Sequence, residues 1–91
     1  MRLDQFLKAS RLIPRRSLAQ NYCEKNLIRV NGVLAKSSKG LNVDDEIEIR
    51  RKDKTLVIRI VAIPANKQVS KELAVKLYSV VSETPQPDEV F

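Results

Sequence analysis

The sequence LIRVNGVLAK, residues 27–36, carries the clearest structural signal in the chain. Asn31-Gly32 stands between two short runs of alternating apolar and polar residues. A two-residue type I′ turn requires a positive φ at both central positions, and Asn and Gly adopt that conformation more readily than other residues. The stretch therefore predicts a β-hairpin with Asn31 as a turn residue.

A short amphipathic helix is predicted before the hairpin, over residues 2–12. Its apolar residues recur at the spacing of one helical face, and they are Leu3, Phe6 and Leu7. Pro14 disfavours the α region at Ile13, so the helix is expected to end near Arg11 or Leu12.

A second helix is predicted with Pro14 in its first turn, where the missing N–H of proline costs nothing. This helix is expected to run to about Lys25, with an apolar face of Leu18, Tyr22 and Cys23. The apolar spacing of Tyr22 favours core packing, and stacking on a base is the alternative.

Two strands are predicted after the hairpin and a loop at residues 37–40. EIEIR, residues 46–50, alternates apolar and polar residues as a half-buried strand does. A charged turn then leads into TLVIRIVAI, residues 55–63, in which Leu56, Ile58 and Ile60 share one face. Pro64 is expected to end the sheet.

A third helix is predicted over residues 71–81, KELAVKLYSVV, with Ser70 as its N-cap. Its apolar stripe would consist of Leu73, Leu77, Val80 and Val81. The last ten residues, SETPQPDEVF, contain two prolines and three acids, a composition typical of a flexible tail.

The order of these elements predicts an α+β fold. Two N-terminal helices would pack on a small, strongly curled, mainly antiparallel sheet, and an additional C-terminal helix would follow. The length of 91 residues suits one domain. We expect this domain over residues 1–64, the C-terminal helix packed on it within 65–81, and the tail at 82–91.

The charge of the chain is concentrated in its first half. The whole chain carries a formal net charge of +6. Residues 1–40 hold nine Lys or Arg and only Asp4 and Glu24 as acids, whereas residues 41–91 hold eight basic and nine acidic residues. This asymmetry favours a binding face for a polyanion over the alternative of an ordinary solvated surface.

Several kinds of chemistry are disfavoured by the composition. The chain has no histidine and a single cysteine, Cys23, so it lacks the usual general base, a disulfide and a zinc site. Cys23 is expected to be a buried structural thiol. The acidic run, Asp44, Asp45, Glu46 and Glu48, is interpreted as a solvated strand entry rather than a Mg²⁺ site. We expect a protein that is not an enzyme and has no metal or cofactor.

The apolar runs of the sequence are short. MRLDQFLKAS lacks the continuous apolar segment of a signal peptide, and LVIRIVAI is too short to span a bilayer. A single cysteine also fits a reducing compartment. We therefore expect a cytoplasmic protein that does not bind membranes.

The first helices carry most of the candidate binding residues. Arg11, Arg15 and Arg16 surround Pro14 at a predicted helix start, where free backbone N–H groups add to an anion site suited to phosphate. The guanidinium group also suits RNA because it binds phosphate in a bidentate manner and stacks on bases. Asp4 would orient Arg2 or Lys8, or favour the first helical turn.

Residues 1–50 resemble the S-four RNA-binding domain, which is named after a small-subunit ribosomal protein. The resemblance rests on the RLD start, a basic residue that opens the second helix, LIRVNG, a lysine after the hairpin, and VDDEI. It implies the S-four fold and RNA contacts by Arg2, Arg11, Arg15, Arg16 and Lys36, with Lys8 and Lys39 as lesser members. Arg15 departs from the pattern, because many members have a helix-capping Ser or Thr there.

The stand-alone domain resembles bacterial ribosome quality-control factors and the small ribosome-associated heat-shock proteins of this class. The resemblance implies binding to ribosomal RNA and peptidyl-tRNA on an obstructed large ribosomal subunit, and we expect the protein to be a monomer. There it would support C-terminal tailing of the stalled chain, together with a tailing factor. The alternatives are a heat-shock-type recycler, an accessory binder of another structured RNA, and a protein–protein adaptor.

Overall fold

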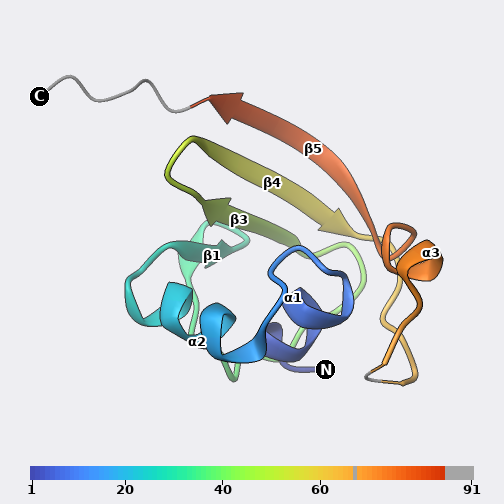
Figure 1. The fold of residues 1–91 in the computed structure, drawn as a ribbon. Coiled ribbons are helices and arrows are strands. Elements are labelled where there is room, and N and C mark those ends of the chain that lie inside the picture. Colours follow the sequence, from blue (N-terminus) through green and yellow to red (C-terminus); the bar gives the residue numbers. More distant parts are fainter. Residues whose placement is uncertain (67, 86–91) are drawn as a thin grey trace, which may run out of the picture.

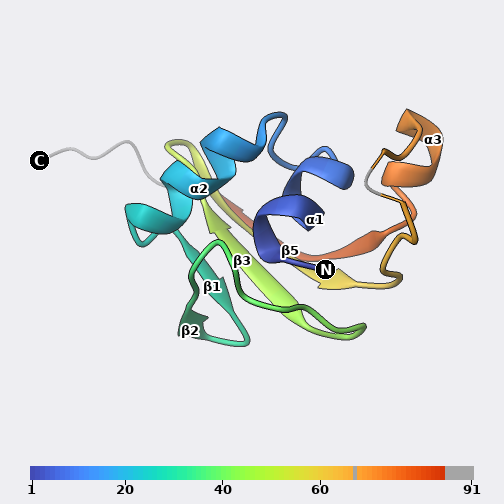
Figure 2. The same ribbon diagram turned by 90° about the horizontal axis from the view of Figure 1, so that it is seen from below.

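The computed structural model describes residues 1–66 and 68–85. Its elements, labelled in Figure 1, are α1 (Leu3–Ala9), α2 (Arg16–Glu24), β1 (Ile28–Val30), β2 (Val33–Leu34), β3 (Glu46–Arg50), β4 (Lys54–Ile60), α3 (Lys71–Ala74) and β5 (Tyr78–Pro85). The strands form one antiparallel sheet in the order β2-β1-β3-β4-β5. α1 and α2 lie on one face of this sheet (Figure 2). The predicted α+β fold is confirmed, with a sheet that stays open.

The hairpin is confirmed as predicted. Asn31 and Gly32 have φ angles of 51° and 83°, and Val30 pairs with Val33 on either side of them. The Asn31 side chain also accepts a hydrogen bond from the Glu46 N–H at 2.9 Å and donates one to Asp45 at 3.1 Å. Asn31 therefore joins the turn to the start of β3 in addition to shaping it.

Both N-terminal helices are shorter than predicted. α1 ends at Ala9 because Arg11 takes up a left-handed conformation, with a φ of 61°, and the Ser10 N–H closes the last turn on Phe6. α2 begins at Arg16 after the extended residue Arg15, so Pro14 precedes the helix instead of lying in its first turn. The predicted end near Lys25 is confirmed.

The core lies between the two helices and the sheet. α1 contributes Leu3, Phe6 and Leu7, all with no exposed surface. Burial of such side chains contributes about 1.5–3 kcal/mol each. The sheet contributes the predicted alternate residues, which are Ile28, Val30, Ile47, Ile49, Leu56, Ile58 and Ile60. On α2, Ala19 and Cys23 are buried and Tyr22 packs against the core, whereas Leu18 is exposed.

The C-terminal segment contradicts the predicted third helix. Ser70 is the N-cap, as expected, and accepts a hydrogen bond from the Leu73 N–H, but α3 stops at Ala74. Residues 78–85 form β5, which pairs with β4 along its whole length. Pro64 therefore does not end the sheet. Residues 82–85 of the expected tail are part of β5, and residues 86–91 lie outside the described part.

Two physical reasons explain the strand. Residues 75–81 contain three valines and a tyrosine, which fit a pleated sheet better than a helix because branching at Cβ restricts χ1. β4 would otherwise leave a seven-residue edge unpaired. A register shift opposite Val57 and Ile58 marks a bulge near Val81.

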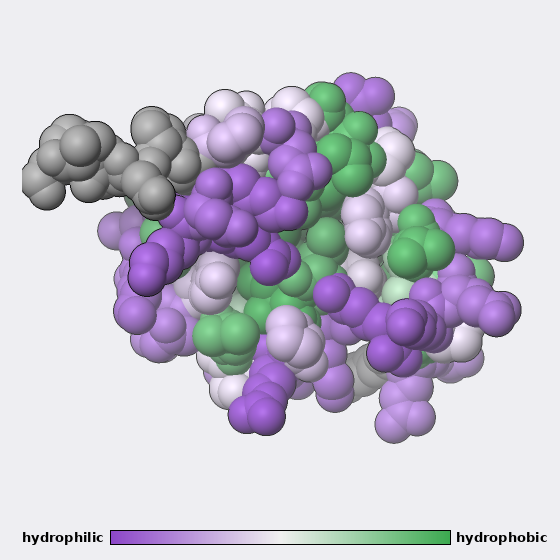
Figure 3. Space-filling view, turned by 45° about the horizontal axis from the view of Figure 1, so that its top comes forward, coloured by the Kyte–Doolittle hydropathy of each residue, from purple (hydrophilic) through white to green (hydrophobic). Residues whose placement is uncertain are grey.

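The surface on the β5 side mixes apolar and charged side chains (Figure 3). Exposed apolar residues of the C-terminal part include Val61, Leu73, Val75, Val80 and Val81. Of the helices in the described ranges, none combines the length and the apolar character needed to cross a membrane.

Candidate nucleic-acid interface

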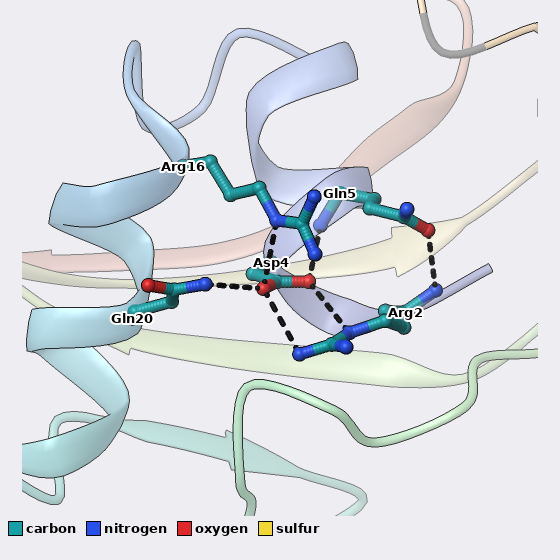
Figure 4. A network of polar contacts seen from close by, with 5 residues as sticks. All are labelled: Arg2, Asp4, Gln5, Arg16 and Gln20. Atoms are coloured by element: carbon teal, nitrogen blue, oxygen red, sulfur yellow. Dashed lines mark hydrogen bonds and ion pairs between the residues drawn. The ribbon is translucent and has the colours of Figure 1, made fainter.

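A buried carboxylate organises the basic residues at the start of the chain. Asp4 has no exposed surface, and it lies between Arg2 at the N-terminus and Arg16 and Gln20 of α2 (Figure 4). Arg16 Nε and Gln20 Nε2 each donate a hydrogen bond to Asp4 Oδ2 at 3.0 Å. Arg2 Nη2 donates to the same oxygen at 3.3 Å, and its Nε lies 3.3 Å from Oδ1. Asp4 therefore orients Arg2, as one of the predicted alternatives has it, and also Arg16.

The carboxylate holds its negative charge in spite of its burial. Burial alone would raise the pKa of Asp4, but the hydrogen bonds from Gln20 and Arg16 and the charges of Arg16 and Arg2 outweigh it, so the pKa lies below its ordinary value of 3.8. One carboxylate serves two guanidinium groups, which leaves the cluster with a net positive charge. Asp4 fixes the arginines in place without neutralising them.

The loop after the hairpin lies beside this cluster. The carbonyls of Lys39 and Ser37 accept hydrogen bonds from the N–H groups of Leu3 and Asp4, at 2.8 and 3.1 Å. These bonds satisfy the first turn of α1, whose N-cap, Arg2, provides no side-chain cap. They also place the loop that carries the exposed Lys36 and Lys39 beside the start of α1. We call the surface formed by Arg2, Arg16, Lys36 and Lys39 the basic face.

The start of α2 adds donors to the basic face. Its N-cap, Arg15, makes no side-chain cap, and its first turn contains no acid. Within residues 1–66 and 68–85 nothing caps the amides of that turn, which are left for an external acceptor. Arg16 has 41% of its side chain exposed, and within the described residues its two terminal nitrogens have no hydrogen-bond partner. The missing Ser or Thr at position 15 thus leaves a helix start open to an anion, with the exposed Arg15 beside it.

Arg11 and Lys8 do not join the basic face. Sequence reasoning placed Arg11 close to Arg15 and Arg16, but its Nη2 lies 3.4 Å from the Val69 carbonyl, a hydrogen bond to the C-terminal segment. Lys8 is exposed at the end of α1 and borders the same region. The seven predicted site residues therefore divide into two groups, one around the starts of α1 and α2 with the loop after the hairpin, and one at the end of α1.

Three supporting residues were not predicted from the sequence. Gln20 lies one turn after Arg16 on α2, and this spacing could have indicated a shared partner. Gln5 accepts a hydrogen bond from the Arg2 N–H through its side chain at 3.3 Å. Arg51, in the turn after β3, donates to the Leu12 carbonyl and so fixes the link between α1 and α2. No local pattern connects Arg51 with Leu12, which are 39 positions apart.

The acidic run after the loop is engaged in the fold. Asp45 accepts from Asn31 and from the Asn42 N–H, and Glu46 forms an ion pair with Arg59. Among the residues that the structure describes, no three His, Cys, Asp or Glu side chains come together as metal ligands would.

Cys23 is buried on α2, and burial, with the charges of Asp4 and Glu24, raises the pKa of its thiol to about 11. At pH 8 only about one thiol in a thousand is then ionised. We expect native protein at pH 8 to react with a thiol reagent far more slowly than protein in denaturant. A disulfide reagent that releases a coloured thiolate on reaction with Cys23 allows both rates to be measured by absorbance. Equal rates in native and denatured protein would contradict the burial of Cys23.

Comparisons with known proteins agree with this geometry. The S4 domain family model matches residues 1–47. The RQC P-site tRNA stabilizing factor of Streptococcus pneumoniae is 42% identical over 90 residues, covering 99% of this chain and 100% of that protein. The protein of that name from Halalkalibacterium halodurans is 45% identical over 85 residues, covering 93% and 94%.

A solved structure supports the same relationship. Vibrio cholerae Heat Shock Protein 15, described as trimeric, superposes with a TM-score of 0.81 at 32% identity, over 90% of this chain and 82% of that one. The family match, the near-full-length relatives and the shared fold together show that this chain belongs to the S4 domain family.

Proposed function

We propose that this protein stabilises a tRNA in the P-site of the large ribosomal subunit during ribosome quality control. The single observation that carries the proposal is the Asp4-centred pair of arginines, which presents oriented guanidinium groups beside an uncapped helix start. Such an array binds phosphates of a folded RNA. Relatives that cover nearly the whole chain bear the name RQC P-site tRNA stabilizing factor, and this name supports the choice of RNA.

The finer parts of the proposal follow from the same features. The basic face and the neighbouring Arg15 would contact ribosomal RNA and tRNA. Lys8 and Arg11 would make further contacts. The factor would act in the cytoplasm as a non-catalytic monomer without a cofactor. A tailing factor on the same subunit would extend the stalled chain.

Gradient sedimentation of extracts from cells with stalled ribosomes tests the proposal. The protein is expected in the fraction of large subunits that carry peptidyl-tRNA. Puromycin transfers the nascent chain off the tRNA, and dissociation of the deacylated tRNA is then expected to remove the protein from that fraction. If the protein sediments equally with empty large subunits, tRNA is not part of its binding site and the proposal is wrong.

A second candidate is the recycling of stalled large subunits, favoured by the similarity to Heat Shock Protein 15. The two candidates differ in the fate of the stalled chain. Loss of a stabilising factor would shorten the C-terminal tails added to stalled chains, whereas loss of a recycler would leave the tails unchanged and increase the number of obstructed subunits. Immunoblots of a stalled reporter measure the first effect and gradients the second.

A further inference from the structure

A groove separates the end of α1 from the C-terminal segment. Its cavity volume is about 560 Å³, and it is lined by Lys8, Ala9, Arg11, Pro14, Gln68, Val69 and Ser70. Arg11 reaches toward Val69 from one wall to the other. The segment at 68–70 and α3 lie on one side of α1, whereas α2 lies on the other (Figures 1 and 2). The groove is therefore separate from the basic face, which lies toward α2.

The charge of the groove favours an anion. Lys8 and Arg11 are both exposed cations, and no lining residue is acidic. Free carbonyls at a helix C-terminus would repel an anion. At the end of α1, however, the carbonyls of Phe6, Leu7 and Lys8 are not free. They accept hydrogen bonds from the backbone N–H groups of Ser10, Ile13 and Arg11, respectively. The two cations thus set the sign of the potential at this end of the helix.

The other residues of the groove can pack against a nucleotide base and form hydrogen bonds with it. The exposed Pro14 and the half-buried Val69 are apolar surfaces against which a base can pack. The exposed Gln68 carries a side-chain amide, which both donates and accepts hydrogen bonds at a base edge. Two cations for a phosphate, an apolar wall and an amide thus lie together at one concave site, and this combination suits an unpaired nucleotide.

We propose that this groove binds a single unpaired, unstacked nucleotide of RNA, with Lys8 and Arg11 on its phosphate and residues 68–70 beside its base. The inference rests on the proposed function, because it assigns a subsite for the RNA that the basic face binds. The far wall lies outside residues 1–47 that match the S4 model, so this subsite belongs to the combination of S4 domain and C-terminal segment.

Photocrosslinking tests the groove directly. The full-length protein would be irradiated with a short single-stranded RNA that contains 4-thiouridine, digested with trypsin and analysed by mass spectrometry. We expect a crosslink on the peptide of residues 68–71 and none on that peptide from a blunt-ended RNA duplex of equal length whose 4-thiouridine lies in an internal base pair. Equal labelling by both RNAs, or labelling confined to peptides of the basic face, would overturn the proposal.

The paired variant Lys8→Gln with Arg11→Gln provides the quantitative test. Glutamine keeps a donor near the Val69 carbonyl but removes both charges, so the crosslink at 68–71 should fall about tenfold, the equivalent of about 1.4 kcal/mol. Lys76→Gln is the control on the same segment and should leave the crosslink unchanged. If the groove variant labels like the control while wild-type protein still sediments with obstructed subunits, only this inference fails.

Discussion

Arg16→Ala is expected to remove the protein from obstructed large subunits. The Arg16 guanidinium is held by Asp4 at 3.0 Å and keeps two terminal nitrogens for a phosphate, at a helix start that has no side-chain cap. Arginines that anchor an interface in this manner contribute about 2 kcal/mol or more, so affinity should fall about 30-fold or further. Gradient sedimentation and binding to purified subunits measure the loss.

The matched control for Arg16→Ala is Arg59→Ala. Arg59 also forms one ion pair with a carboxylate, with Glu46 at 2.9 Å, and is also about half exposed, but it lies on β4 among residues that face away from the helices. Both variants lower the net charge by one. If the two variants weaken binding equally, the effect is one of overall charge, and the basic face is not the site.

The salt dependence of binding also distinguishes a phosphate contact by Arg16 from an effect of overall charge. Removal of a cation that neutralises one phosphate lowers the slope of log K against log salt by roughly 0.7–0.9. Arg16→Ala should show that decrease in slope, and Arg59→Ala should not. Circular dichroism verifies the folded state of both variants. Arg59→Ala loses only an exposed ion pair, whereas Arg16→Ala removes one of several partners of the buried Asp4 and should lower the free energy of unfolding more, with Arg2 and Gln20 still bonded to the carboxylate.

Much of the fold was predictable because its signals are local. The Asn31-Gly32 turn, the alternation in β3 and β4 and the apolar stripe of α1 each depend on residues within a few positions of one another. β5 was not predictable in that way. Its valines fit either a short helix or a strand, and the open edge of β4, about twenty residues earlier in the chain, decides between them.

The candidate site was likewise predictable only where its signals are local. The basic residues of the first forty positions could be recognised from charge alone, but their grouping could not. Asp4 joins Arg16 and Gln20 across 12 and 16 positions, and Arg11 pairs with Val69 across 58. Such contacts depend on how α1 packs against α2 and the C-terminal segment, which local sequence patterns do not reveal.

Asp4→Asn is expected to weaken binding to obstructed subunits although it makes the protein more positive. A count of charges predicts the opposite, because removal of an acid strengthens the attraction to RNA. The structure predicts the loss because both carboxylate oxygens of Asp4 face donors, whereas the neutral amide offers only one acceptor. If its oxygen faces Arg16 and Gln20, its NH2 group faces the Gln5 N–H and Arg2 Nε. We expect a loss of about tenfold or more on subunits, with non-specific RNA binding equal or stronger. Asp53→Asn, an exposed acid in the turn before β4, is the control with the same charge change.

The same substitution should lower the free energy of unfolding by about 1–3 kcal/mol, a range below that of a fully buried pair because both arginines are partly exposed. Since the folded pKa of Asp4 lies below 3.8, the ionised carboxylate stabilises the protein fully above the ordinary value, and this stabilisation is lost as the pH falls through the folded pKa. The difference in unfolding free energy between wild type and Asp4→Asn should therefore be constant near neutral pH and shrink below pH 3.8. Denaturant unfolding at pH 7, 5 and 3 measures it. A difference that persists undiminished at pH 3 would mean that shape, and not the charge of Asp4, holds Arg2 and Arg16 in place.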